Sequence, residues 1–120
     1  MTAPVEFVLL VAVPPADPVA ACARRFARAA LAEGHRVPLI FFQAEGVYHG
    51  LPASAPAEEG DAGAEWAALA AQGVDLVLCA GAAARRGIGA AGLPAGMRIA
   101  GVGGLIAAMS RAGRVLTFGG

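Results

Sequence analysis

Residues 5–13, VEFVLLVAV, form a nearly continuous apolar run that is rich in β-branched side chains. Such a run is typical of a strand that is buried on both faces of a parallel sheet. Two prolines end it, and Asp17 before Pro18 is a pattern that begins a helix, expected at 18–32. A second apolar run, VPLIFFQ, follows at 37–43. Strand, helix and strand within about 40 residues predict a βαβ unit with parallel strands.

The alternation of strands and helices continues to the end of the chain. Helices are expected at 61–72, 80–86 and 103–111, and strands at 74–79, 97–102 and 114–118. Five short strands alternating with helices predict an α/β protein, a three-layer α/β/α sandwich of flavodoxin-like type with a five-stranded, mainly parallel sheet. A chain of 120 residues fits a single domain, expected to span 1–120.

The composition excludes several classes of function. Nine arginines balance nine acidic residues, and a neutral chain without a basic stripe argues against direct nucleic-acid binding. The apolar run at 7–13 is too short to span a bilayer. No basic region precedes this run, so nothing resembles a signal peptide. We therefore expect a cytoplasmic protein that does not associate with membranes.

The chain also lacks the motifs that hold metals and phosphates. His35 and His49 are isolated, so no Cys/His cluster has zinc spacing. A phosphate loop would follow the first strand, but VPPADP at 13–18 carries prolines that have no N–H group to offer. The sequence GVGG at 101–104 lacks the full dinucleotide-binding pattern. We expect no cofactor.

The two cysteines have different surroundings. Cys22 falls on the apolar stripe of the expected helix 18–32 beside Phe26, so we expect it to be a small buried residue. In the same helix Arg24, Arg25 and Arg28 are expected to point away from that stripe.

The second cysteine lies in LVLCAGAAARRG, residues 76–87, where Cys79 ends a buried strand just before a helix. The carboxyl ends of strands are where open α/β sheets bind their ligands. Free N–H groups and the positive end of the helix dipole favour a thiolate over a thiol there. From these residues alone, a packing role and a chemical role for Cys79 both remain open. Arg85 and Arg86 follow about two helical turns later.

Several stretches together resemble the DsrE/TusD family, whose members are subunits of the DsrEFH/TusBCD sulfur-relay complexes. The matching stretches are FFQAEGVYHG at 41–50, LCAGAAARRG at 78–87 and GLIAAMSRAGRVLTF at 104–118. The resemblance covers nearly the whole chain, in order and with similar spacing, and Cys79 falls on the active cysteine of the family. The proline-rich segment at 13–18 and the sequence of the loop at 50–60 depart from the family pattern.

The resemblance implies a flavodoxin-like fold, an activity and a set of partners. Cys79 would accept sulfane sulfur as a persulfide and pass it to a cysteine of a partner protein, without a cofactor. The implied partners are DsrF/TusC-like and DsrH/TusB-like subunits in a heterohexamer, a TusA-like sulfur donor and a DsrC/TusE-like acceptor. The sulfur would serve either 2-thiouridine synthesis in tRNA or cytoplasmic sulfur oxidation, and the sequence does not distinguish these two routes.

The resemblance also suggests which residues surround the active cysteine. The residues expected at the pocket or at a partner contact are Glu45, Gly46, Val47, Tyr48, Arg85 and Arg86. Packing of Tyr48 against Trp66 is an equal alternative, and His49 is expected to be solvent-exposed. Two other functions stay open: a non-catalytic structural subunit of a hetero-oligomer, and a DsrE-like homo-oligomer that acts alone.

Overall fold

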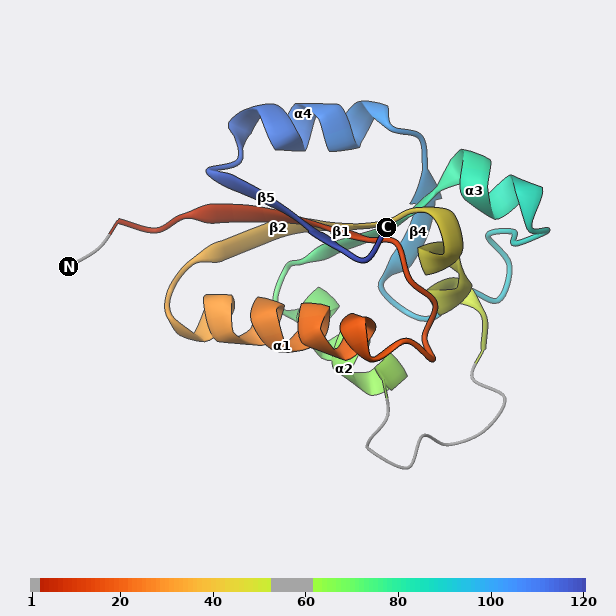
Figure 1. Ribbon diagram of the computed structural model, residues 1–120, viewed down its shortest axis with the longest axis horizontal. Helices are drawn as coiled ribbons and strands as arrows, with labels where there is room; N and C mark the ends of the chain where they lie inside the picture. The colour runs from red at the N-terminus through yellow and green to blue at the C-terminus, as the bar shows by residue number, and fades with distance from the viewer. Residues whose placement is uncertain (1–2, 53–61) are drawn as a thin grey trace.

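A five-stranded parallel sheet forms the centre of the computed structural model, which describes residues 3–52 and 62–120 (Figure 1). The strands are β1 (Glu6–Val11), β2 (Arg36–Phe42), β3 (Asp75–Cys79), β4 (Met97–Ala100) and β5 (Arg114–Phe118). They lie in the order β4-β3-β2-β1-β5, and each pairing is parallel. The predicted sheet is confirmed, and all of its strands run in the same direction.

Helices lie on both faces of the sheet and complete the predicted three-layer sandwich. They are α1 (Pro18–Ala32), α2 (Ala62–Ala71), α3 (Ala80–Arg85) and α4 (Gly103–Arg111), with a 3₁₀ helix η1 at Ala44–Gly50. Figure 1 shows α1 and α2 on one face of the sheet, α4 over the other face, and α3 at the carboxyl ends of the strands. The chain moves across the sheet in one direction from β1 to β4, so right-handed crossovers place the connecting helices on the same side. The connection from β4 to β5 runs in the opposite direction, and α4 therefore lies on the other side.

The larger part of the core lies between the sheet and the layer of α1 and α2. Helix α1 turns a face of alanines toward the sheet: Ala20, Ala23, Ala27 and Ala30. These small side chains let the helix lie close to the large strand residues, among which Phe42 and Leu9 are fully buried. The core under α4 is smaller and includes Phe41 and Leu105.

The predictions that Cys22 is buried and that Arg24 points away from the core are wrong. The side of α1 that is buried against the sheet is the alanine face, not the stripe that contains Cys22 and Phe26. Cys22 is exposed, and its sulfur lies 3.5 Å from Nη2 of Arg25. Arg24 is buried on the edge of the alanine face. The sequence places Cys22 and Ala23 on adjacent faces of one helix, and both faces are apolar enough to be the inner one.

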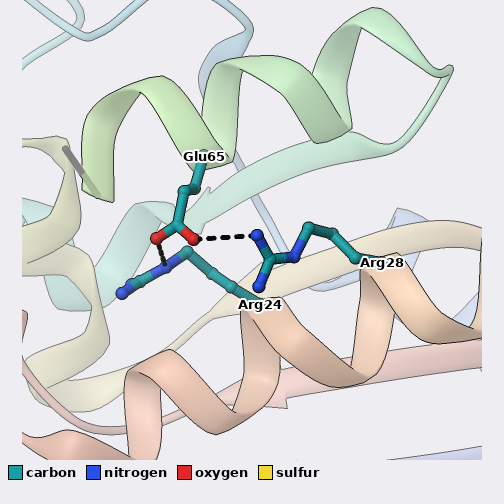
Figure 2. A network of polar contacts seen from close by, with 3 residues as sticks. All are labelled: Arg24, Arg28 and Glu65. Atoms are coloured by element: carbon teal, nitrogen blue, oxygen red, sulfur yellow. Dashed lines mark hydrogen bonds and ion pairs between the residues drawn. The ribbon is translucent and has the colours of Figure 1, made fainter. Parts of the chain in front are cut away.

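The burial of Arg24 is explained by an ion-pair network between α1 and α2 (Figure 2). Nε of Arg24 lies 2.9 Å from Oε2 of Glu65, and Nη1 of Arg28 lies 3.1 Å from the other carboxylate oxygen. The guanidinium of Arg24 also lies over the ring of Trp66, 5.2 Å from its centroid. A buried charge needs such partners, so Glu65 makes the position of Arg24 possible.

Ala44, the first residue of η1, has a left-handed backbone conformation with φ 49°. Because this conformation costs a residue with a Cβ about 1–2 kcal/mol, replacing Ala44 with glycine should raise the free energy of unfolding by about 1 kcal/mol. Urea denaturation with an unchanged m-value measures the effect. The matched control is Ala107→Gly in the exposed part of α4, which should lower stability by about 1 kcal/mol. A loss of stability in both variants would contradict the strain at Ala44.

Candidate functional site

The parallel sheet collects the predicted site residues at its carboxyl edge. Val11 at the end of β1 pairs with Phe42 of β2 and with Phe118 of β5. On the other side Cys79, the last residue of β3, pairs with Ala100 of β4. The strand ends therefore lie along one edge, as the sequence predicts, and η1 and α3 begin at this edge.

Cys79 occupies the junction of β3 and α3. It is the last strand residue and also the residue that precedes the first turn of α3, with an extended backbone. Its side chain is half-buried, packs against the cores on both faces of the sheet, and forms no disulfide. Helix α3 has six residues, so its dipole is small. The side chain is thus held in place by packing and remains partly open to solvent.

The 3₁₀ helix η1 lies against α3 and carries the predicted residues of the segment 45–48. Gly46 and Val47 are buried, whereas Glu45 is exposed. A Cβ at Gly46 would collide with the carbonyl oxygen of Val11, so glycine allows η1 to lie against the end of β1. The inner residues of this segment fix η1 in place, and Glu45 is left available to contact a partner.

Tyr48 and Arg86 meet between η1 and α3. The guanidinium of Arg86 lies over the ring of Tyr48, 5.8 Å from its centroid, and Nη1 of Arg86 donates to the carbonyl oxygen of Ala82 at 3.2 Å. The alternative partner of Tyr48, Trp66, packs instead against Phe42 with the ring centroids 5.0 Å apart. Two of the residues predicted from the sequence thus contact each other directly.

Arg85 behaves differently from Arg86. Its side chain is exposed and runs back along α3 toward Gly81, where a Cβ would lie 3.4 Å from Nη1 of Arg85. Within the part of the chain that the structure describes, Arg85 takes part in no ion pair. It is therefore free to meet a group from outside the chain.

His49 was expected to be exposed, and this prediction is wrong. The ring is buried, Nε2 lies 3.1 Å from the carbonyl oxygen of Val13, and the centroid is 5.4 Å from that of Trp66. The pKa of His49 is lowered to about 4, chiefly because burial disfavours the charged ring; the hydrogen bond to Val13 acts in the opposite direction, and the nearby charge of Arg24 adds to the lowering. His49 is therefore neutral at pH 7 and ties η1 to the segment after β1.

Within residues 3–52 and 62–120, no helix is long and apolar enough to cross a membrane. Over the same residues, no three His, Cys, Asp or Glu side chains come together as a metal site would require. The carboxyl edge carries the thiol of Cys79, which forms no disulfide.

Fold and site together define an α/β/α sandwich protein with a partly accessible thiol at the carboxyl edge of its parallel sheet. The sequence model of the DsrE/DsrF-like family matches residues 6–118. The chain belongs to the DsrE/DsrF-like family.

Curated relatives support this assignment. Sulfurtransferase TusD of Serratia proteamaculans is 38% identical over 112 residues, which cover 82% of this chain and 87% of the relative. A TusD homolog of Pseudomonas aeruginosa is 36% identical, with 96% of this chain and 98% of the relative covered. Sulfurtransferase TusD of an Enterobacter species is 46% identical over 71 residues, 58% of this chain and 56% of the relative.

Solved structures show the same fold. The ychN protein of E. coli superposes with a TM-score of 0.84 at 24% identity, covering 97% of this chain and all of the other. MTH1491 of Methanobacterium thermoautotrophicum, a protein of unknown function, gives a TM-score of 0.74 at 15% identity and covers 93% of this chain. At these identities the likeness concerns the fold.

Proposed function

We propose that this chain is a sulfurtransferase subunit of a sulfur relay and carries sulfane sulfur as a persulfide on Cys79. The observation that carries the proposal is the free, half-buried thiol of Cys79 at the carboxyl edge of the sheet. The curated relatives named sulfurtransferase TusD support sulfur transfer as the activity of the family. The single reactive thiol at this edge supports Cys79 as the carrier.

The proposed step is an exchange between sulfur atoms. The thiolate of Cys79 attacks the outer sulfur of a persulfide on a donor protein. A sulfur–sulfur bond forms on Cys79, the sulfur–sulfur bond of the donor breaks, and the donor cysteine leaves as a thiolate. In the second half, the thiolate of an acceptor cysteine removes the outer sulfur from Cys79 in the same way. Because there is no net oxidation, the step needs no redox cofactor.

The surrounding residues suit a site that another protein must reach. Tyr48 and Arg86 contact each other between η1 and α3, while Glu45 of η1 and Arg85 of α3 are exposed. Persulfide exchange needs an accessible sulfur more than a closed pocket. We assign Glu45 and Arg85 to contacts with donor or acceptor, and Gly46 and Val47 to the support of η1.

The proposed partners follow from membership of the family. They are DsrF/TusC-like and DsrH/TusB-like subunits, a TusA-like sulfur donor and a DsrC/TusE-like acceptor. Neighbouring genes distinguish the two routes for the sulfur: a dissimilatory sulfite reductase cluster points to cytoplasmic sulfur oxidation, and its absence points to tRNA thiolation.

Replacing Cys79 with serine should abolish sulfur loading. Incubation with a protein persulfide donor should add about 32 Da per sulfur atom to the wild-type chain, as measured by intact-protein mass spectrometry. Cys22→Ser is the matched control, because Cys22 is the second cysteine of the chain and is exposed on α1. It should load as the wild type does. Loading that survives in Cys79→Ser and disappears in Cys22→Ser would overturn the assignment.

A further inference from the structure

Arg86 follows the last turn of α3 and makes two contacts, one with η1 and one with α3 itself. Its guanidinium lies over the ring of Tyr48, 5.8 Å from the ring centroid, and its Nη1 donates to the carbonyl oxygen of Ala82 at 3.2 Å. A planar guanidinium can stack on a ring and donate within its own plane, so the two contacts are compatible. The half-buried side chain of Arg86 is therefore held from two sides.

The contact with Ala82 replaces a backbone hydrogen bond. In a continuous α-helix the N–H of Arg86 would donate to the carbonyl oxygen of Ala82, four residues earlier. Here this N–H donates to the carbonyl oxygen of Ala83 at 3.1 Å, which tightens the end of the helix. The carbonyl oxygen of Ala82 loses that backbone donor, and the side chain of the same arginine supplies another. Arg86 thus completes the end of α3 and also links it to η1.

Cys79, Ala82 and Arg86 lie along one side of α3. Ala82 follows Cys79 by three residues and Arg86 follows Ala82 by four, and these spacings place side chains on one side of a helix. Cys79 precedes the first turn and Arg86 follows the last, at the two ends of a helix about 9 Å long. Because so short a helix has little stability of its own, tertiary contacts determine its position.

The partner of Arg86 belongs to a segment that is fixed against the sheet beside Cys79. The 3₁₀ helix η1 contacts both α3 and β3. A Cβ at Gly50 would collide with Cδ2 of Leu78, so the end of η1 lies directly against the residue that precedes Cys79. Strand β3, η1 and α3 therefore form a closed arrangement: Leu78 contacts η1, Tyr48 links η1 to Arg86, and Cys79 joins α3 to β3.

We propose that Arg86 is a positioning residue: through Tyr48 and α3 it fixes the thiol of Cys79 for attack on the outer sulfur of the donor, a role that rests on the proposed function. Exchange between sulfur atoms needs the attacking sulfur at the correct place and angle, so a small displacement of the thiolate lowers the rate steeply. The two neighbouring arginines then differ in role, since Arg86 acts within the chain and the exposed Arg85 faces outward.

Single-turnover loading of Cys79 from glutathione persulfide, a small donor, tests the role of Arg86 by intact-protein mass spectrometry of quenched samples. All variants carry Cys22→Ser, which leaves Cys79 as the single cysteine of the chain. Arg86→Gln and Tyr48→Leu should each lower the maximal loading rate about tenfold and leave the half-saturating donor concentration unchanged. Tyr48→Phe should retain most of the wild-type rate, because the phenyl ring keeps the face that Arg86 covers.

The double variant Tyr48→Leu/Arg86→Gln should load no more slowly than the slower single variant, since both changes remove the same contact. Rate losses that multiply in the double variant would overturn the proposal. A raised half-saturating donor concentration with an unchanged maximal rate in Arg86→Gln would also overturn it, because that result marks a contact with the donor.

Arg111→Gln is the matched control, because Arg111 is an exposed arginine in the last turn of another helix, α4. Its loading rate should equal that of the wild type. Urea denaturation shows whether each variant is folded under the assay conditions. If Arg86→Gln is not folded, the comparison of Tyr48→Leu with Tyr48→Phe decides the same point.

Alkylation of Cys79 by iodoacetamide separates the positioning role from the persulfide role, because it measures the thiol without a sulfur donor. An alkylation rate that changes in Arg86→Gln and Tyr48→Leu and returns in Tyr48→Phe supports the positioning of the thiol. If the wild-type chain then loads no sulfur, only the carrier role is lost. Unchanged alkylation and unchanged loading in Arg86→Gln would overturn the positioning role and leave Cys79 as the carrier.

Discussion

Replacing Gly46 with alanine should lower the free energy of unfolding by about 3 kcal/mol. A Cβ at this position would overlap the carbonyl oxygen of Val11, a backbone atom that cannot turn aside as a side chain could. This oxygen is also fixed by a hydrogen bond, 3.0 Å long, from the backbone N–H of Gln43. Either η1 must move away from β1 or the end of the sheet must shift. Urea denaturation of the variant measures the cost.

Gly103→Ala is the matched control for Gly46→Ala. Gly103 is the first residue of α4, and a Cβ there has no heavy atom within 4 Å. Because alanine favours helix over glycine, this control should be neutral or gain up to about 1 kcal/mol. Equal stability of the two variants would contradict the close contact between η1 and β1. In that case Gly46 would have to be reconsidered as a partner contact.

Acidification should remove about 3 kcal/mol of stability through His49 alone, since its pKa falls from 6.5 to about 4 on folding. In the unfolded chain His49 binds a proton below pH 6.5, whereas in the folded protein the buried ring stays neutral. The contribution of the neutral His49 ring to the free energy of unfolding is therefore present in full above pH 6.5. It is lost progressively as the pH falls toward 4. Urea titrations at several pH values across this window measure the loss.

His49→Gln is the variant that isolates this effect. Glutamine has a side-chain amide that can donate to the carbonyl oxygen of Val13, as Nε2 of His49 does, but it does not titrate. The variant is expected to lose packing against Phe42 and Trp66 at every pH, and its stability should depend less on pH between 6.5 and 4. If both proteins lost the same stability on acidification, His49 would not be the group responsible.

The order of strands and helices could be predicted because each element has a strong local signal. The run at 5–13 produces β1, and the run at 37–43 produces β2. The position of Cys79 at the start of a helix was also predictable, since the apolar run before it and the alanines after it mark the junction. Parallel pairing then brings η1 and Cys79 to one edge without further information.

The errors concern side chains whose surroundings come from distant parts of the chain. Arg24 is buried because Glu65, 41 residues away, supplies its counter-charge. His49 is buried because Val13, 36 residues away, offers a carbonyl oxygen. Cys22 was misplaced because helix α1 has two apolar faces, and only packing on the sheet decides which one lies inside. A local pattern contains none of these contacts.

The order β4-β3-β2-β1-β5 has a consequence for synthesis on the ribosome, where the N-terminal part of the chain emerges first. The first four strands can pair in sequence as they appear. Strand β1 keeps one edge without a neighbour until β5, the last strand, has been made. During that interval the open edge and the apolar residues that α4 later covers, Val8 and Phe41 among them, are exposed to other chains. The nascent protein is thus most prone to aggregation just before residues 103–120, which contain α4 and β5, are complete.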